Sequence, residues 1–154
     1  MRVAIADHHQ LFREAIKRLL ESLAGVKIVG ECSSGEEAVE LVRSITPDIL
    51  LIEVAMPGIG GLEALHRIKL MQAGTRVVVL TGHSHAPFPT QMLRAGASGF
   101  LTKTLLSKNS ICACVEFILA AVIFAKKSLK NWLIFLLALQ NKAPSTHCPS
   151  VRCR

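Results

Sequence analysis

The sequence predicts an α/β fold: a doubly wound parallel sheet of five strands with helices on both faces. Five short apolar runs alternate with stretches of helical spacing, and short turns connect them. The third run, Ile49 to Ile52, is too short for a typical helix and is rich in branched side chains. We therefore interpret it as a central strand buried on both faces.

Each remaining element follows from a local pattern. The five predicted strands are Val3 to Ala6, Val26 to Val29, Ile49 to Ile52, Val77 to Leu80, and Phe100 to Lys103. The four predicted helices include Phe12 to Leu23, Ser34 to Ile45, a helix through Leu62 to Lys69 that Gly74 ends, and Pro87 to Ala95. Ser34 and Glu37 have the spacing of a capping box at the start of the second helix.

Four chemically active side chains are predicted at one edge of this sheet. Asp7, Glu53, Thr81 and Lys103 each fall at the carboxyl end of a predicted strand. Because the carboxyl ends of parallel strands share one edge, we expect these side chains to converge there. Open α/β sheets place their chemistry at this edge.

Charge and cysteine content divide the chain at about residue 103. Up to Lys103 the basic and acidic residues nearly balance, so most of the net charge of +7 belongs to residues 104–154. The positive charge is therefore no sign that the first domain binds nucleic acid. The N-terminus lacks the pattern of a signal peptide, so we expect a cytoplasmic chain with reduced cysteines.

The strand-end residues, together with the phrase HAPFPTQMLRAGASGFLTK, resemble the receiver domain of two-component response regulators. The resemblance is to the NarL/LuxR branch, in particular to the GacA/UvrY-like regulators, and it covers residues 1 to about 104. It implies a receiver domain over residues 1–106 with a flavodoxin- or CheY-like sheet in the order 2-1-3-4-5. The implied function is signal transduction in a phosphorelay, without enzymatic activity of its own.

The same resemblance assigns roles to positions at the sheet edge. In the family, an acidic pair and an acceptor aspartate hold Mg²⁺ while a histidine kinase donates a phosphoryl group. Matching positions are the first acid Asp7, the phosphate-sensing Thr81 and Lys103, and the switch aromatic Phe100. The chain departs at two positions: His8 replaces the second acid, and Glu53 replaces the acceptor aspartate.

Both departures affect the chemistry. Imidazole is a poor ligand for Mg²⁺, and glutamate carries its carboxylate about 1.5 Å farther out, when misplacements near 1 Å can cost on the order of a hundredfold in rate. We therefore expect no phosphoryl transfer to Glu53, no cofactor, and Mg²⁺ binding that is weak or absent. Glu53 either pairs with Lys103 without switching anything or imitates an acylphosphate with one negative charge.

A different class of function, a metal-dependent hydrolase, would use the histidines of this edge. His8, His9, His83 and His85 follow predicted strand ends beside Asp7 and Glu53, and a borderline metal such as Zn²⁺ could use that set. We favour solvated loop histidines, because adjacent histidines rarely aim both rings at one point. The hydrolase hypothesis also lacks a nucleophile or a positioned base. The later cysteines match no standard zinc spacing.

Beyond Thr104 we predict a fifth helix over residues 107–125 and an aberrant basic and apolar tail over residues 126–154, helical or disordered. Back-translated in a shifted frame, Leu119 to Leu133 and Lys142 to Arg154 can encode stretches that resemble the linker and the helix-turn-helix opening of GacA/UvrY-like regulators. We infer a frameshift that replaced the DNA-binding half, and we expect no specific DNA binding.

The expected partners follow from this interpretation. The degenerate receiver is a signalling module without phosphotransfer, and the alternative is a receiver that still titrates a sensor histidine kinase or an intact response regulator. A homodimer is a further expectation. The apolar run from Ile111 to Ala125 contains Glu116 and is too short to span a bilayer, so we expect no membrane insertion.

Overall fold

The sheet has the predicted strand order. The structure is a computed structural model that describes residues 1–82 and 88–103. Its five strands pair in parallel in the order β2-β1-β3-β4-β5. The strands are β1 (Arg2–Ala6), β2 (Lys27–Cys32), β3 (Ile49–Glu53), β4 (Arg76–Thr81) and β5 (Gly99–Thr102). The α/β class and the 2-1-3-4-5 order are confirmed.

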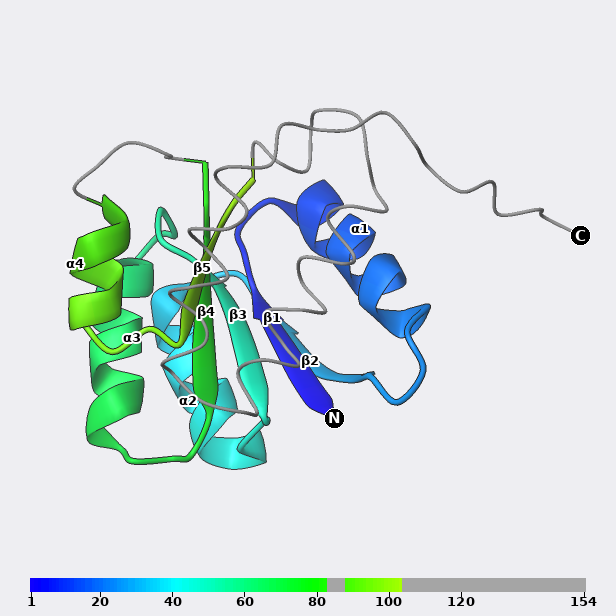
Figure 1. The fold of residues 1–154 in the computed structure, drawn as a ribbon, viewed down its shortest axis with the longest axis horizontal. Coiled ribbons are helices and arrows are strands. Elements are labelled where there is room, and N and C mark those ends of the chain that lie inside the picture. Colours follow the sequence, from blue (N-terminus) through cyan, green and yellow to red (C-terminus); the bar gives the residue numbers. More distant parts are fainter. Residues whose placement is uncertain (83–87, 104–154) are drawn as a thin grey trace, which may run out of the picture.

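Helices cover both faces of the sheet. Within the described part, α2, α3 and α4 lie on one face and α1 lies on the other (Figure 1). The helices are α1 (Gln10–Glu21), α2 (Gly35–Ile45), α3 (Gly60–Leu70) and α4 (Phe88–Arg94). All four predicted helices are present, with ends that differ by a few residues from the predicted ones.

The largest boundary error falls on β2. The second strand is present as predicted, but it runs over Lys27–Cys32 and not over Val26 to Val29. Gly30 and Glu31 are poor strand formers, which hid the second half of the strand in the sequence. Pairing with β1 nevertheless holds them in the sheet, because Ala4 is in register with Gly30 and Ile5 with Glu31.

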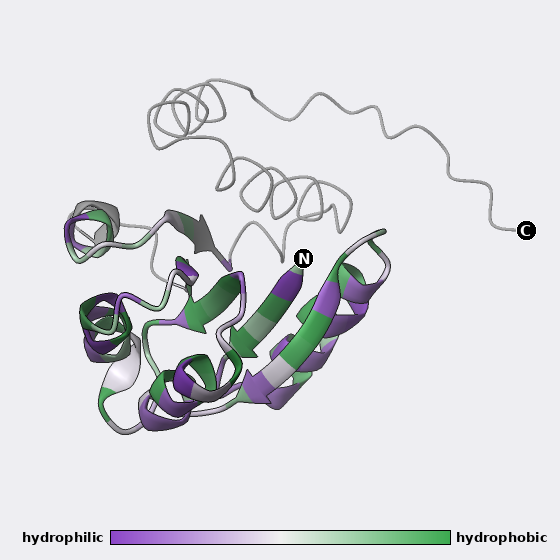
Figure 2. Cartoon of the chain, turned by 90° about the horizontal axis from the view of Figure 1, so that it is seen from below, coloured by the Kyte–Doolittle hydropathy of each residue, from purple (hydrophilic) through white to green (hydrophobic). Residues whose placement is uncertain are grey.

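Strand β3 is the most deeply buried element of the sheet. All five of its residues are buried, including the terminal Glu53. Leu50 and Ile52 belong to a cluster on the face covered by α2 and α3, whereas Ile49 and Leu51 belong to a second cluster on the face of α1. Hydrophobic residues accordingly follow the strands, while the helices carry hydrophilic ones as well (Figure 2).

Helix α2 begins with a capping arrangement close to the predicted one. The Ser34 hydroxyl accepts a hydrogen bond from the backbone N–H of Glu37 at 3.3 Å. The Glu37 carboxylate accepts from the N–H of Ser33, one residue earlier than in a standard capping box, at 2.8 Å. These hydrogen bonds favour the ionised form and lower the pKa of Glu37.

Several expectations lie outside the described residues. These are the fifth helix over 107–125, the tail over 126–154, and the histidines at positions 83 and 85. In the part of the chain that the structure covers, no helix is long and apolar enough to cross a bilayer.

Candidate functional site

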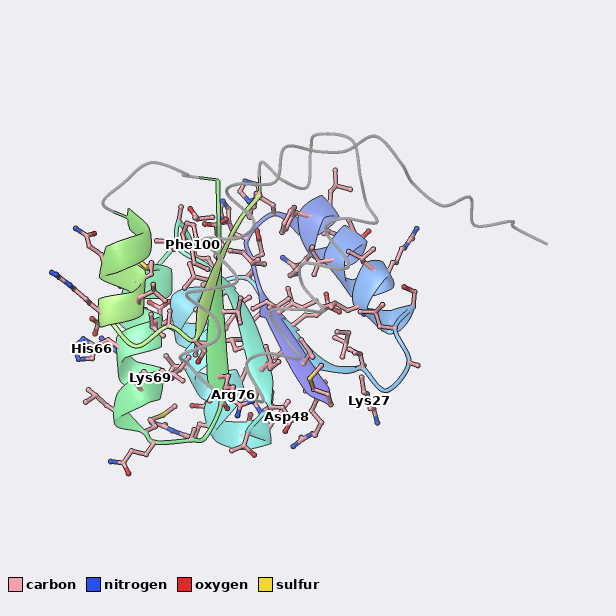
Figure 3. The ribbon with its side chains drawn as sticks, in the orientation of Figure 1. Lys27, Asp48, His66, Lys69, Arg76 and Phe100 are labelled. Atoms are coloured by element: carbon pink, nitrogen blue, oxygen red, sulfur yellow. The ribbon has the colours of Figure 1, made fainter. Side chains whose placement is uncertain are left out.

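Strand register brings the predicted residues to one edge of the sheet. Ala6 is in register with Ile52, so Asp7 follows β1 where Glu53 ends β3. Thr81 pairs with Thr102 at the end of β4, and the backbone N–H of Lys103 donates to the carbonyl of Thr81 at 2.7 Å. The opposite edge carries Lys27, Asp48 and Arg76 (Figure 3).

Lys103 lies between the two carboxylates of this edge. Its Nζ is 2.5 Å from Oδ2 of Asp7 and 2.5 Å from Oε2 of Glu53. Asp7 is fully buried, Glu53 is 3% exposed, and the Lys103 side chain is 15% exposed. The contacts are ion pairs that lack the angles of hydrogen bonds donated by Nζ. One buried cation therefore partly neutralises two buried anions.

The Glu53 carboxylate also bonds to its own turn. Its Oε1 accepts from the backbone N–H groups of Val54 at 2.7 Å and Ala55 at 3.1 Å. The extra methylene of glutamate allows the side chain to reach these groups while Oε2 contacts Lys103. Both oxygens of the residue at the acceptor position are thus engaged.

The Asp7 carboxylate is held from its own loop. Its Oδ1 accepts from the backbone N–H of His9 at 2.8 Å and lies 3.1 Å from Nδ1 of the same histidine. The backbone carbonyl of Asp7 accepts from Nη1 of Arg13 at 2.5 Å. With Lys103 at Oδ2, both carboxylate oxygens of Asp7 have partners as well.

These residues do not fit Mg²⁺. The ion requires hard oxygen ligands in near-octahedral geometry. Here a backbone donor, an imidazole or an ammonium contacts each carboxylate oxygen of Asp7 and Glu53, and the second acidic position carries His8. An ammonium already occupies the space between the two carboxylates that a shared cation would need.

Thr81 and Phe100 are both buried at or near this edge. Thr81 has no exposed surface, and Phe100 is 8% exposed and belongs to the cluster on the face of α2, α3 and α4. Figure 3 places Phe100 on β5, on the side of α4. The phosphate-sensing and switching roles implied for Thr81, Lys103 and Phe100 remain predictions.

Helix α1 supplies two contacts that the sequence analysis did not anticipate. Nζ of Lys103 lies 4.3 Å from the ring centroid of Phe12, within the range of a cation–π interaction. Arg13, besides holding the Asp7 carbonyl, lies 3.7 Å from Glu31 of β2. By helical spacing Phe12 lies on the apolar face of this helix and Arg13 on the polar face, and this spacing contains no sign of either contact.

The histidines divide into a described pair and an undescribed pair. The rings of His8 and His9 lie 3.8 Å apart between centroids, at 44° to each other. His83 and His85 fall outside the described residues, so the larger metal set of the hydrolase hypothesis is untested. Among the cysteines, Cys32 is a buried free thiol.

The fold and the edge define a class of protein, a receiver-like α/β module with an acid, a hydroxyl and a lysine at its strand ends. The comparison with family models agrees, because residues 3–116 match the response regulator receiver domain. The chain belongs to this family. The match extends past residue 106, and the predicted domain boundaries stay predictions.

Curated relatives place the chain near the regulators that its motifs resemble. It is 43% identical over 111 residues to the response regulator UvrY of Escherichia coli strain K12, covering 72% of this chain and 51% of that one. It is 42% identical over 103 residues to the response regulator GacA of Pseudomonas aeruginosa, covering 67% and 48%. The chain thus spans about half the length of these relatives.

Solved structures show the same relation. The signal receiver domain of the response regulator NarL from Mycobacterium tuberculosis superposes with a TM-score of 0.72 at 32% identity, over 82% of this chain and 97% of that one. A two-component response regulator of the LuxR family from Aurantimonas sp. SI85-9A1 gives 0.71 at 27% identity, over 89% and 97%.

Proposed function

We propose that this chain is a degenerate receiver module that acts by binding rather than by accepting a phosphoryl group. The observation that carries the proposal is the position of Lys103 Nζ, 2.5 Å from both Asp7 and Glu53. The ammonium group lies between the two carboxylates, where a divalent cation would otherwise bind. The module has no catalytic activity of its own and does not need Mg²⁺.

The electrostatics at position 53 support this proposal. Phosphoryl transfer brings further negative charge to an acceptor that is already anionic, and receiver chemistry needs a divalent cation to offset it. Lysine supplies one positive charge, and two carboxylates already share it. A nucleophilic oxygen of Glu53 would also have to leave either Lys103 or the N–H groups of Val54 and Ala55.

Incubation with acetyl phosphate and Mg²⁺, followed by intact mass spectrometry, tests this proposal. We expect the unchanged chain to gain no phosphoryl mass. The matched control is the double variant His8→Asp with Glu53→Asp, which restores three carboxylates at the edge and should become labelled. Phosphoryl mass that peptide mapping assigns to Glu53 in the unchanged chain would contradict the proposal.

The alternative is a receiver that still binds a sensor kinase or an intact regulator and titrates it. Receiver domains of this family interact with such partners, and the five-stranded sheet forms in the described residues despite the altered edge. Leu11 of α1 is 84% exposed and two residues along the chain from His9, and we take it as the candidate contact for such a partner.

Pull-down with a sensor kinase distinguishes the two forms of the proposal. If the chain titrates a kinase, Leu11→Asp should weaken the capture, whereas Leu70→Asp should not. Leu70 is 72% exposed at the end of α3 and serves as the matched control. If the unchanged chain does not capture the kinase, the alternative is excluded and the chain is an inert module.

Three expectations remain predictions. The expected lack of specific DNA binding, and the frameshift inferred to cause it, concern residues 104–154, which lie outside the described residues. A cytoplasmic location and a homodimer are likewise untested.

A further inference from the structure

We propose that Asp7, His8 and His9 form a binding site for a borderline divalent cation, with Zn²⁺ as the reference ligand. The substitution that removes the second acid puts two adjacent imidazoles beside a buried carboxylate. One ligand atom from each of the three residues lies within 4.8 Å of the other two. The inference goes beyond the proposed function and does not depend on it.

The pair formed by Asp7 and His9 already has the spacing of metal ligands. Oδ1 of Asp7 lies 3.1 Å from Nδ1 of His9. Two ligands on a tetrahedral Zn²⁺ with bonds near 2.0–2.1 Å are separated by about 3.3 Å. A metal ion could therefore take the place of the proton between these atoms with a small displacement of either group.

Adjacent histidines rarely aim both rings at one point, but the rings of His8 and His9 lie side by side here, and His8 supplies the third ligand from the same loop. It is exposed, and its ring lies beside that of His9, with centroids 3.8 Å apart. Among the described residues, no hydrogen bond or ion pair ties the His8 ring elsewhere, so it can turn toward the metal at little cost. Three protein ligands with an open fourth position for water are a common arrangement for accessible zinc.

Neighbouring groups orient the carboxylate of the site. The backbone N–H of His9 donates to Oδ1 at 2.8 Å, and Lys103 contacts the other oxygen. Such outer contacts fix the direction of a ligand. Lys103 and Arg13 add positive charge nearby, and Glu53 and Glu31 offset it. The affinity therefore comes from the ligand bonds rather than from a negative field.

The donor set favours borderline cations over hard ones. Imidazole nitrogen suits Zn²⁺, Co²⁺, Ni²⁺ and Cu²⁺, whereas Mg²⁺ requires oxygen. The change at position 8 that makes the edge unsuitable for Mg²⁺ thus makes it suitable for another class of ion.

Isothermal titration of the full chain with Zn²⁺ tests the inference through matched variants. His8→Ala and His9→Ala should each lower the affinity for one equivalent of Zn²⁺ by more than about tenfold. Tenfold is the lower end of what is lost when a group that merely contacts a metal ligand is removed. His66→Ala is the control, because His66 is exposed on α3, on the other side of the sheet from α1 (Figure 3). Undiminished binding of every equivalent in both site variants would overturn the proposal.

A second measurement on the unchanged chain does not require the variants to fold. Co²⁺ bound by nitrogen and oxygen gives d–d absorption without a thiolate charge-transfer band. We expect at least one equivalent of Co²⁺ with this spectrum, in addition to any Co²⁺ that cysteines bind. A spectrum in which every bound Co²⁺ shows thiolate charge transfer would overturn the site at Asp7, His8 and His9.

Discussion

The extra methylene group of Glu53 and the ammonium group of Lys103 determine which contacts the carboxylates make at the carboxyl edge of the sheet. The longer side chain of Glu53 bends back so that Oε1 meets the N–H groups of Val54 and Ala55. Oε2 then reaches Lys103, which also contacts Asp7. An aspartate at position 53 would hold its carboxylate about 1.5 Å closer to the backbone, so it could not keep the same set of contacts.

Replacing Lys103 by methionine should strongly destabilise the domain. The change leaves Asp7 and Glu53 buried together without their shared cation, and removing one partner of a buried ion pair costs about 3–5 kcal/mol. The free energy of unfolding from urea titration measures the effect. Lys17→Met is the matched control, because its pair with Glu31 is more exposed and should contribute far less to stability. Equal effects of the two changes would contradict the buried-pair assignment.

Cys32 provides a second test at this scale. Its thiol is buried, and burial, followed by the nearby charge of Glu37, raises the pKa of Cys32 to about 12 from an ordinary value of 9.0. Iodoacetamide reacts with the thiolate, so at pH 8 the folded chain should be alkylated at Cys32 at least about a hundredfold more slowly than the chain unfolded in urea. Peptide mapping separates this residue from the later cysteines. Comparable rates in the two states would show that the thiol is accessible.

The same shift has a defined effect on stability. The pKa of the folded state lies above that of the unfolded state, so the contribution of Cys32 is complete below about pH 9. It is lost as the pH rises toward about 12, because only the unfolded chain can ionise the thiol in that range.

At the scale of elements, the contact between α3 and β3 fixes the backbone at the site. Gly61 in the first turn of α3 lies against the end of β3, and a Cβ at this position would come within 2.0 Å of the carbonyl oxygen of Glu53. The N–H of Gly61 also donates to the carbonyl of Val54 at 2.9 Å. The lack of a side chain at Gly61 therefore allows the helix to approach the acceptor strand.

Gly61→Ala should separate α3 from β3. Since the clash is with backbone, which cannot rotate away, we expect a loss of about 1–3 kcal/mol in the free energy of unfolding. Gly82→Ala is the control, because a Cβ at Gly82 meets nothing within 4 Å and its backbone is not in the left-handed region. We expect that change to stay within about 0.5 kcal/mol. If Gly61→Ala leaves the free energy of unfolding unchanged, α3 and β3 can move apart at this contact without cost.

At the scale of the whole molecule, the sheet has a hydrophobic core on each face. Leu50 and Leu51 are adjacent in β3 and both fully buried, yet they belong to different clusters. In the described part, three helices cover the face of Leu50, while α1 alone covers the face of Leu51 (Figure 1).

If both faces are packed, Leu50→Ala and Leu51→Ala should have similar costs. Each change removes a fully buried side chain, with an expected loss of about 2–5 kcal/mol in urea unfolding. Leu70→Ala is the control, because the Leu70 side chain is 72% exposed. A small effect at Leu51 alone would mean that the face toward α1 is loosely packed.

Much of this architecture could be predicted from the residues themselves. Apolar runs and turn residues indicated the five strands, and the strand ends placed Asp7, Glu53 and Lys103 on one edge. In the structure Lys103 contacts both Asp7 and Glu53 there. The end of β2 could not be predicted in this way, since Gly30 and Glu31 are held in their strand by pairing with β1 and not by their own preference.

The sequence by itself determined the fold class, the strand order through family resemblance, and the identity of the groups at the acceptor edge. These depend on residue type and on the alternation of strands and helices, which the chain carries locally. Only the tertiary structure decided that Lys103 contacts both acids, that Glu53 bonds to its own turn, and that His9 and Arg13 hold Asp7. Such contacts depend on side-chain torsions and on distances between segments far apart in the sequence, and no local pattern of residues specifies them.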